Sequence, residues 1–184
     1  MDMRADLLIV GAGMVGSALA LALQHSGLEI LLIDGSPLSV QRFDDEAPFE
    51  PRVSALSAAS QRILERLGAW QGISERRLSP YSDMHVWDGS GTGQIHFSAA
   101  SVHAEVLGHI VENRVVQDGL LERLHDSEIG LLPNARLERM RRSGDEWLLT
   151  LADGRNLRAP VVIAADGANS AVRRLTRCET RQRG

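Results

Sequence analysis

Short apolar runs separated by polar segments divide the chain into alternating strands and helices. Residues 7–10, 29–33 and 161–165 are almost entirely apolar, as expected for strands buried on both faces of a parallel sheet. Residues 14–25 are rich in leucine and alanine, which indicates a helix packed against that sheet. Residues 136–157 alternate around an Asp-Gly turn signal and predict a small antiparallel β-meander. The order of these elements predicts an α/β fold.

The middle of the chain carries weaker patterns, in which two amphipathic helices and a hairpin are predicted. Apolar residues between 56 and 67 fall on one helical face. Residues 84–88 and 94–97 predict two short strands around a glycine-rich turn. The second helix is expected to begin with Asn113 as its N-cap, with its apolar side on residues 116–124.

Two arginines lie close to the predicted starts of these helices. Arg114 falls in the first helical turn, where a cation is unfavourable for the helix dipole. We therefore expect an anionic ligand near it; the alternative is a solvent-screened arginine that costs only a few tenths of a kcal/mol. Arg52 precedes the first helix, and its local sequence alone favours a solvated surface residue.

A glycine motif directly follows the first buried strand. Gly11, Gly13 and Gly16 have G-x-G-x-x-G spacing, and Asp34 ends the next strand 18 residues after Gly16. In dinucleotide-binding folds these glycines allow a tight turn, approach to a pyrophosphate and close helix packing, while an acid about 20 residues later accepts from a ribose. Asp34 could instead belong to a simple turn, but the order of elements favours a Rossmann-like three-layer nucleotide-binding domain.

A second candidate site follows the last apolar strand. Asp166 and Gly167 come directly after residues 161–165 and before a predicted helix at 170–175. Ligands collect at the carboxyl ends of strands in open α/β sheets. We therefore distinguish this pair from the Asp-Gly turn of the meander, which joins polar-edged strands.

Composition excludes several classes of function. The net charge of −4 gives no electrostatic argument for nucleic acid binding. A single cysteine, Cys178, excludes internal disulfides and suggests a reducing compartment. The first strand begins too early for a signal peptide before it, and no apolar run approaches a membrane span. His85 and His96 lack an accompanying carboxylate or cysteine at ligand spacing, so no metal site is predicted.

Taken together, these segments resemble the single-component flavoprotein aromatic hydroxylases of the p-hydroxybenzoate hydroxylase fold. Among them, the chain is most similar to the ubiquinone-biosynthesis hydroxylases, which act on prenylated phenols. The matching segments are residues 9–19, 52–60, 67–70, 81–88, 107–113 and 164–172.

The resemblance implies a Rossmann-like three-layer FAD-binding domain and assigns roles to individual residues. Gly11, Gly13, Met14 and Gly16 would hold the ADP part of FAD, and Asp34 its adenosine ribose. Arg52 would lie along the pyrophosphate and ribityl chain, and Arg114 would also contact FAD. Asp166 and Gly167 are associated in the family with both FAD and NAD(P)H. The residues point to no catalytic acid–base pair.

The implied activity is hydroxylation of an aromatic ring with NAD(P)H and O2. The resemblance further implies a small aromatic substrate, contact with other ubiquinone-biosynthesis proteins, and a cytoplasmic protein with peripheral contact to the inner membrane. Residues 1–184 are expected to be the N-terminal FAD-binding domain of a longer monooxygenase, without its later Gly-Asp motif and substrate sheet, and inactive alone. An NAD-dependent Rossmann dehydrogenase and a non-catalytic FAD-binding fragment remain as alternatives.

Overall fold

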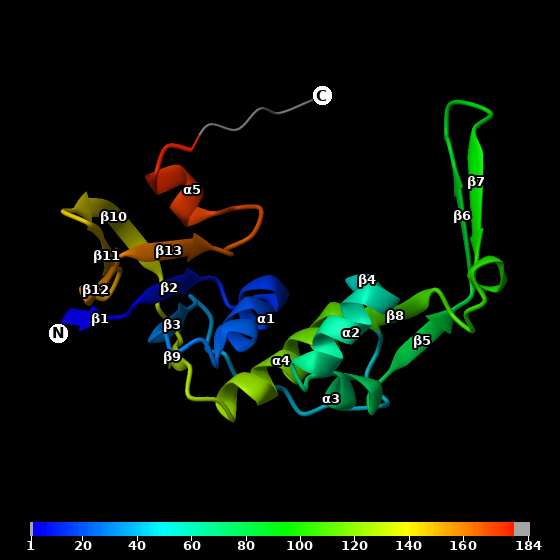
Figure 1. Cartoon of the computed structure of the whole chain (residues 1–184), viewed down its shortest axis with the longest axis horizontal. Coiled ribbons are helices and arrows are strands. Elements are labelled where there is room, and N and C mark those ends of the chain that lie inside the picture. The colour runs from blue at the N-terminus through cyan, green and yellow to red at the C-terminus, as the bar shows by residue number, and fades with distance from the viewer. Residues whose placement is uncertain (1, 179–184) are drawn as a thin grey trace. The chain divides into compact units, whose positions relative to one another are not determined.

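The computed structural model describes residues 2–178, which divide into two compact units (Figure 1). One unit combines the chain up to Val40 with the chain from Leu120 onward, and the other is Gln41–Gly119. Within residues 2–178, no helix combines the length and apolar character that crossing a bilayer requires.

The first unit is built on the predicted parallel sheet. Its order is β13 (Val161–Ala164), β2 (Leu7–Val10), β3 (Ile30–Ile33) and β9 (Gly130–Leu132), and all neighbouring strands are parallel. Every residue of β2 and β3 is buried, which accounts for their continuous apolar sequences. Helix α1 (Met14–Leu23) connects these two strands. The α/β prediction is therefore confirmed.

The predicted meander forms a second sheet in the same unit. It contains β10 (Leu137–Ser143), β11 (Glu146–Leu151) and β12 (Asn156–Ala159), and each of these strands pairs antiparallel with the next one along the chain. Strand β1 (Asp2–Arg4) pairs parallel with β12 at the edge of the sheet. The short helix α5 (Ala171–Leu175) follows β13.

The core of this unit lies between the two sheets. Because side chains alternate along a strand, one face of the parallel sheet turns toward the meander and the other toward α1. The buried side chains that join the two sheets and α5 are Leu8, Val10, Leu31, Ile33, Leu149, Leu151, Leu157 and Val172. The result is the three-layer arrangement that the sequence predicted.

The second unit contains a three-stranded antiparallel sheet and a separate hairpin. Strand β8 (Gly108–Glu112) lies between β4 (Val53–Ser57) and β5 (Leu78–Tyr81). The hairpin consists of β6 (Asp83–Trp87) and β7 (Gln94–Ser98), as predicted. Four further elements complete the chain order: α2 (Ala58–Arg66), α3 (Trp70–Ser74), the 3₁₀ helix η1 (Ala99–Val102) and α4 (Asn113–His125).

Two helix starts differ from the sequence prediction. Residues 53–57 pair with β8 as a strand, so the helix expected from Leu56 begins only at Ala58. Ser57 caps it, because its hydroxyl accepts a hydrogen bond from the Ser60 amide at 3.3 Å. Helix α4 begins at Asn113 itself, whose side-chain oxygen accepts from the Ser54 hydroxyl at 2.6 Å instead of capping the helix.

Candidate cofactor site

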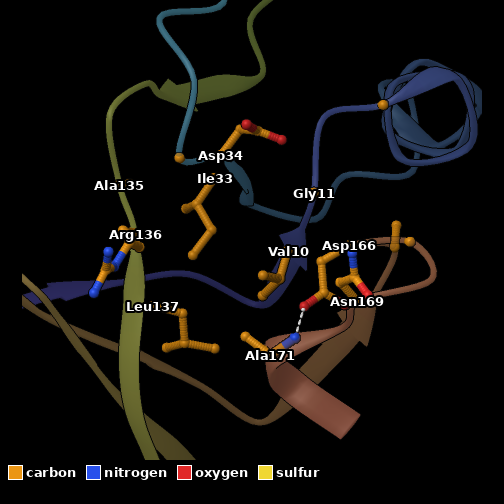
Figure 2. Close-up of a pocket in the computed structure, with 14 residues that line it drawn as sticks. Val10, Gly11, Ile33, Asp34, Ala135, Arg136, Leu137, Asp166, Asn169 and Ala171 are labelled. Atoms are coloured by element: carbon orange, nitrogen blue, oxygen red, sulfur yellow. Dashed lines mark hydrogen bonds between the residues drawn. The ribbon is translucent and has the colours of Figure 1, made fainter. Parts of the chain in front are cut away.

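A pocket of about 420 Å³ opens at the carboxyl ends of β2, β3 and β13, a volume within the usual range for small-molecule sites. Figure 2 shows residues from these strand ends surrounding it. Five of the predicted cofactor residues line it: Gly11, Gly13, Asp34, Asp166 and Gly167. The structure thus brings the glycine motif, the ribose candidate and the late Asp-Gly pair together.

Gly11 and Gly16 are required by packing. A Cβ on Gly11 would lie 2.4 Å from the Ala165 carbonyl oxygen, and the φ of Gly11 is +104°. A Cβ on Gly16 would lie 1.9 Å from the Gly11 carbonyl oxygen. Neither position accepts a side chain without movement of the backbone, so both glycines hold the turn from β2 into α1.

Gly13 has a different environment. No atom lies within 4 Å of a Cβ built on it, although it lines the pocket. It is the N-cap of α1, where no side chain makes a capping hydrogen bond and no acidic residue occupies the first turn. Unpaired amides at a helix N-terminus attract anions. The open space beside Gly13 therefore fits a phosphate group, and Met14 begins the helix that would bind it.

The Asp34 carboxylate organises the loops around the pocket. One oxygen accepts from the Ala12 amide at 2.7 Å, and the other accepts from the amide and hydroxyl of Ser36 at 2.8 and 2.6 Å. The contacts with Ser36 confirm the turn interpretation of Asp34, while its role toward a nucleotide stays a prediction. A carboxylate has about four lone-pair sites, so one of them remains free to accept a further hydrogen bond.

Asp166 is engaged with the helix that follows it. One oxygen accepts from the Ala171 amide at 2.6 Å (Figure 2) and from the Val172 amide at 3.1 Å. The other oxygen accepts from the Ser170 hydroxyl at 2.6 Å. These contacts satisfy the N-terminus of α5. The neighbouring Gly167 has a φ of +73° and open space around its Cβ position, which allows close approach by a ligand.

The sequence did not identify the part of the pocket that comes from the start of β10. Ala135, Arg136 and Leu137 line it, together with Asn169. The Ala135 amide donates to the Asp34 carbonyl at 2.7 Å. This segment follows β9, so the rule that ligands meet the carboxyl ends of parallel strands could have located it.

Arg52 and Arg114 lie in the second unit, and the structure brings them close to each other there. The Asn113 amide donates to the Arg52 carbonyl at 2.9 Å, and the next residue, Val53, pairs with Glu112. Both arginines therefore sit at the junction where β4 begins and β8 ends.

The histidines of the hairpin form a small polar cluster. The rings of His85 and His96 are 4.4 Å apart, and His96 Nε2 is 3.0 Å from Asp83 Oδ1. The structure therefore places one carboxylate beside this histidine pair. The Ser82 hydroxyl and His96 lower the pKa of Asp83 by hydrogen bonding to its carboxylate. Across residues 2–178, however, no three histidine, cysteine or acidic side chains gather at a spacing suited to a metal ion.

The fold and pocket define a nucleotide-binding protein of the Rossmann-like class, in which open space at Gly13 and the Asp34 carboxylate share one pocket. The chain belongs to the family described as FAD binding domain, whose match covers residues 4–183. Membership of this family identifies FAD as the cofactor.

Two curated relatives are similar in sequence to this chain. The chain is 36% identical to the 3-demethoxyubiquinol 3-hydroxylase of Escherichia coli (strain K12), over 92% of this chain and 43% of the relative. It is 37% identical to the ubiquinone hydroxylase UbiL of Rhodospirillum rubrum, over 94% of this chain and 39% of the relative. The chain thus spans about two fifths of the length of these relatives.

A solved structure shows the same fold. The p-nitrophenol 4-monooxygenase PnpA of Pseudomonas putida DLL-E4 matches with a TM-score of 0.71 at 21% identity, over 96% of this chain and 44% of that chain. This likeness supports the arrangement of strands and helices described above.

Proposed function

We propose that the chain is the FAD-binding part of an FAD-dependent monooxygenase that hydroxylates the aromatic ring of a prenylated phenol in ubiquinone biosynthesis, with NAD(P)H and O2 as co-substrates. The observation that carries the proposal is the open space at Gly13, beside the uncapped N-terminus of α1 and in one pocket with Asp34. The two relatives, named as a 3-demethoxyubiquinol 3-hydroxylase and a ubiquinone hydroxylase, support the reaction and the substrate class.

The residues of the pocket bind and orient the cofactor. Backbone amides at Gly13 and Met14 would donate to the pyrophosphate, and the remaining lone pair of Asp34 would accept from the adenosine ribose. Gly11 and Gly16 keep the loop close enough to the sheet for this contact. Electron transfer from NAD(P)H and oxygen insertion are chemistry that FAD supplies when bound.

Arg52 and Arg114 are proposed as further FAD-binding residues, and Asp166 with Gly167 as residues that act toward both FAD and NAD(P)H. The support for Arg114 is that its Nε and one terminal nitrogen are buried and have no hydrogen-bond partner among the described residues. Buried unpaired donors require a partner, and an anionic cofactor would provide one. For Asp166, the three hydrogen bonds to α5 would hold the Asp-Gly loop in place.

The remaining features of the proposal follow from the substrate class. A prenylated phenol is strongly apolar, which favours a cytoplasmic protein in peripheral contact with the inner membrane and with other ubiquinone-biosynthesis proteins. A non-catalytic FAD-binding module is a second candidate, because the pocket accounts for cofactor binding alone.

The test compares this chain with a chain extended to the length of its relatives. Each is mixed with FAD and desalted, and the visible absorbance of retained flavin is measured. We expect flavin on both, but NAD(P)H oxidation and a hydroxylated phenol, identified by mass spectrometry, only with the extended chain. Retained flavin without oxidation in the extended chain would favour the non-catalytic module. Absence of flavin from the extended chain would refute the proposal.

A further inference from the structure

A buried carboxylate stands at the end of β8, between two arginines. Glu112 is only 2% exposed. Its Oε2 lies 3.4 Å from a terminal nitrogen of Arg77, and its Oε1 lies 3.6 Å from Nε of Arg114. The side chains of the two arginines are themselves only 17% and 22% exposed. All three groups belong to the second unit.

The same cluster holds the loop that leads to Arg52. The Glu50 amide donates to Glu112 Oε1 at 2.6 Å. Arg77 donates to the Ala47 carbonyl at 2.7 Å, and its guanidinium lies 4.3 Å from the centre of the Phe49 ring. Glu112 therefore contacts Arg114 directly and fixes the backbone two residues before Arg52.

The cluster is not a closed structural salt bridge. Two guanidinium groups face one carboxylate, so a positive charge remains uncompensated. Both ion-pair distances exceed ordinary hydrogen-bond lengths, and Arg77 and Arg114 each keep two buried nitrogens with no hydrogen-bond partner among the described residues. An ion pair retained for stability alone should be well paired, because burying charge is costly. The excess charge instead fits a site prepared for an anion.

We propose that Glu112 is a positioning residue, which orders Arg114 and the loop before Arg52 so that both cations are in place when the anionic cofactor binds. This inference rests on the proposed role of the two arginines in FAD binding. Glu112 would act through the arginines, without touching the cofactor. Preorganisation of this kind raises affinity because ordering is not required at the moment of binding.

The first experiment measures the order of Arg114 without any cofactor. Glu112→Gln removes the charge and keeps an oxygen for the Glu50 amide, and Glu105→Gln makes the same change at an exposed position. Phenylglyoxal modification of Arg114 is followed by peptide mass spectrometry, with circular dichroism as the folding control. We expect Arg114 to react several-fold faster in Glu112→Gln and at the wild-type rate in Glu105→Gln. An unchanged rate in folded Glu112→Gln would overturn the proposal.

The second experiment is a double-mutant cycle on FAD affinity, read from flavin fluorescence. Glu112→Gln and Arg114→Met should each raise the Kd for FAD about tenfold, and the double variant should raise it by clearly less than the product of the two effects, because Glu112 acts in part through Arg114. A purely structural role for Glu112 predicts multiplied effects in the double variant. That outcome would overturn the proposal.

The two experiments separate this inference from the proposed function. The proposed function is refuted if neither the wild-type chain nor its extended form binds FAD. Even then, the reactivity of Arg114 shows whether Glu112 orders the Arg114 side chain. If Glu112→Gln does not fold, Glu112→Asp keeps the charge but withdraws it by one methylene. Arg114 should then react faster than in wild type, and an equal rate would count against the positioning role.

Discussion

Replacing Gly13 with alanine separates cofactor binding from folding. The new methyl group would meet no atom within 4 Å, and the φ of −67° at Gly13 is ordinary for alanine. Alanine is a poorer N-cap than glycine by about 0.5–1 kcal/mol. It also reduces the entropy of the unfolded chain, which stabilises by about 0.4–1 kcal/mol. These effects nearly cancel, so the melting temperature should change by no more than about 2–4 °C.

The effect on FAD should be much larger. The methyl group would fill the space where a pyrophosphate approaches the α1 amides, and hydrogen bonds to charged groups contribute about 1.5–3 kcal/mol each. Weakening one of them raises the Kd by about tenfold or more. Titration of FAD, followed by flavin fluorescence, measures the Kd, and thermal unfolding is recorded on the same samples.

Two other glycines provide matched controls. Gly93 also has open space around its Cβ position but lies in the hairpin turn, outside the pocket, so Gly93→Ala should bind FAD normally. Gly16→Ala should lower the melting temperature, because overpacking typically costs about 1–3 kcal/mol and its Cβ would lie 1.9 Å from the Gly11 carbonyl oxygen. Wild-type FAD affinity in Gly13→Ala would refute the placement of the pyrophosphate beside Gly13.

Three further predictions concern carboxylates. Asp34→Asn should weaken FAD and ADP binding about tenfold and leave FMN binding unchanged in titrations, because FMN lacks the adenosine ribose. Asp166→Ala removes three hydrogen bonds to α5 and should lower the free energy of unfolding by about 1–3 kcal/mol, measured by thermal denaturation. Ser82→Ala removes the largest cause of the lowered pKa of Asp83, so NMR titration of that carboxyl should give a pKa closer to 3.8. Because the folded pKa of Asp83 is depressed, its contribution to stability is present above the unfolded pKa and is lost as pH falls through the folded value.

Each of these has a contradicting outcome. Equal losses of FAD and FMN affinity would remove Asp34 from the ribose position. If Asp166→Ala is as stable as the wild type, the hydrogen bonds of Asp166 contribute no more to stability than the bonds to water that they replace on folding. An unchanged pKa of Asp83 in Ser82→Ala would assign the shift to His96.

The local sequence pattern was sufficient to predict the parallel sheet but not the three-stranded antiparallel sheet of the second unit. The runs at residues 7–10 and 29–33 are apolar throughout their buried lengths, as expected for strands that are buried on both faces of a sheet. The segment Val53–Ser57 alternates between exposed and half-buried residues, and Leu56 also fits the apolar face of the helix that follows. The segment forms a strand because it pairs with Gly108–Glu112, about fifty residues away. No local sequence signal indicates that partner.

The same distinction applies to the pocket. The glycine motif of the pocket and the two strand ends that are followed by Asp34 and Asp166 could be predicted. Parallel strands direct their carboxyl ends to one edge of the sheet. Ala135 and Arg136 enter the pocket because β9 pairs with β3, which places the following turn against Asp34. From sequence, the Pro133-Asn134 turn indicates only a change of direction.

The charge of Arg114 is compensated only in part by its partner within the protein. A cation in the first turn of a helix is unfavourable for the helix dipole and is stabilised by a nearby anion, and the structure supplies one within the protein, the buried Glu112. Arg77 shares that carboxylate, however, so one negative charge serves two positive ones. The internal anion therefore orders Arg114 without neutralising the cluster. The expectation of an external anion, first drawn from the position of Arg114 along the chain, therefore persists after its protein partner is known.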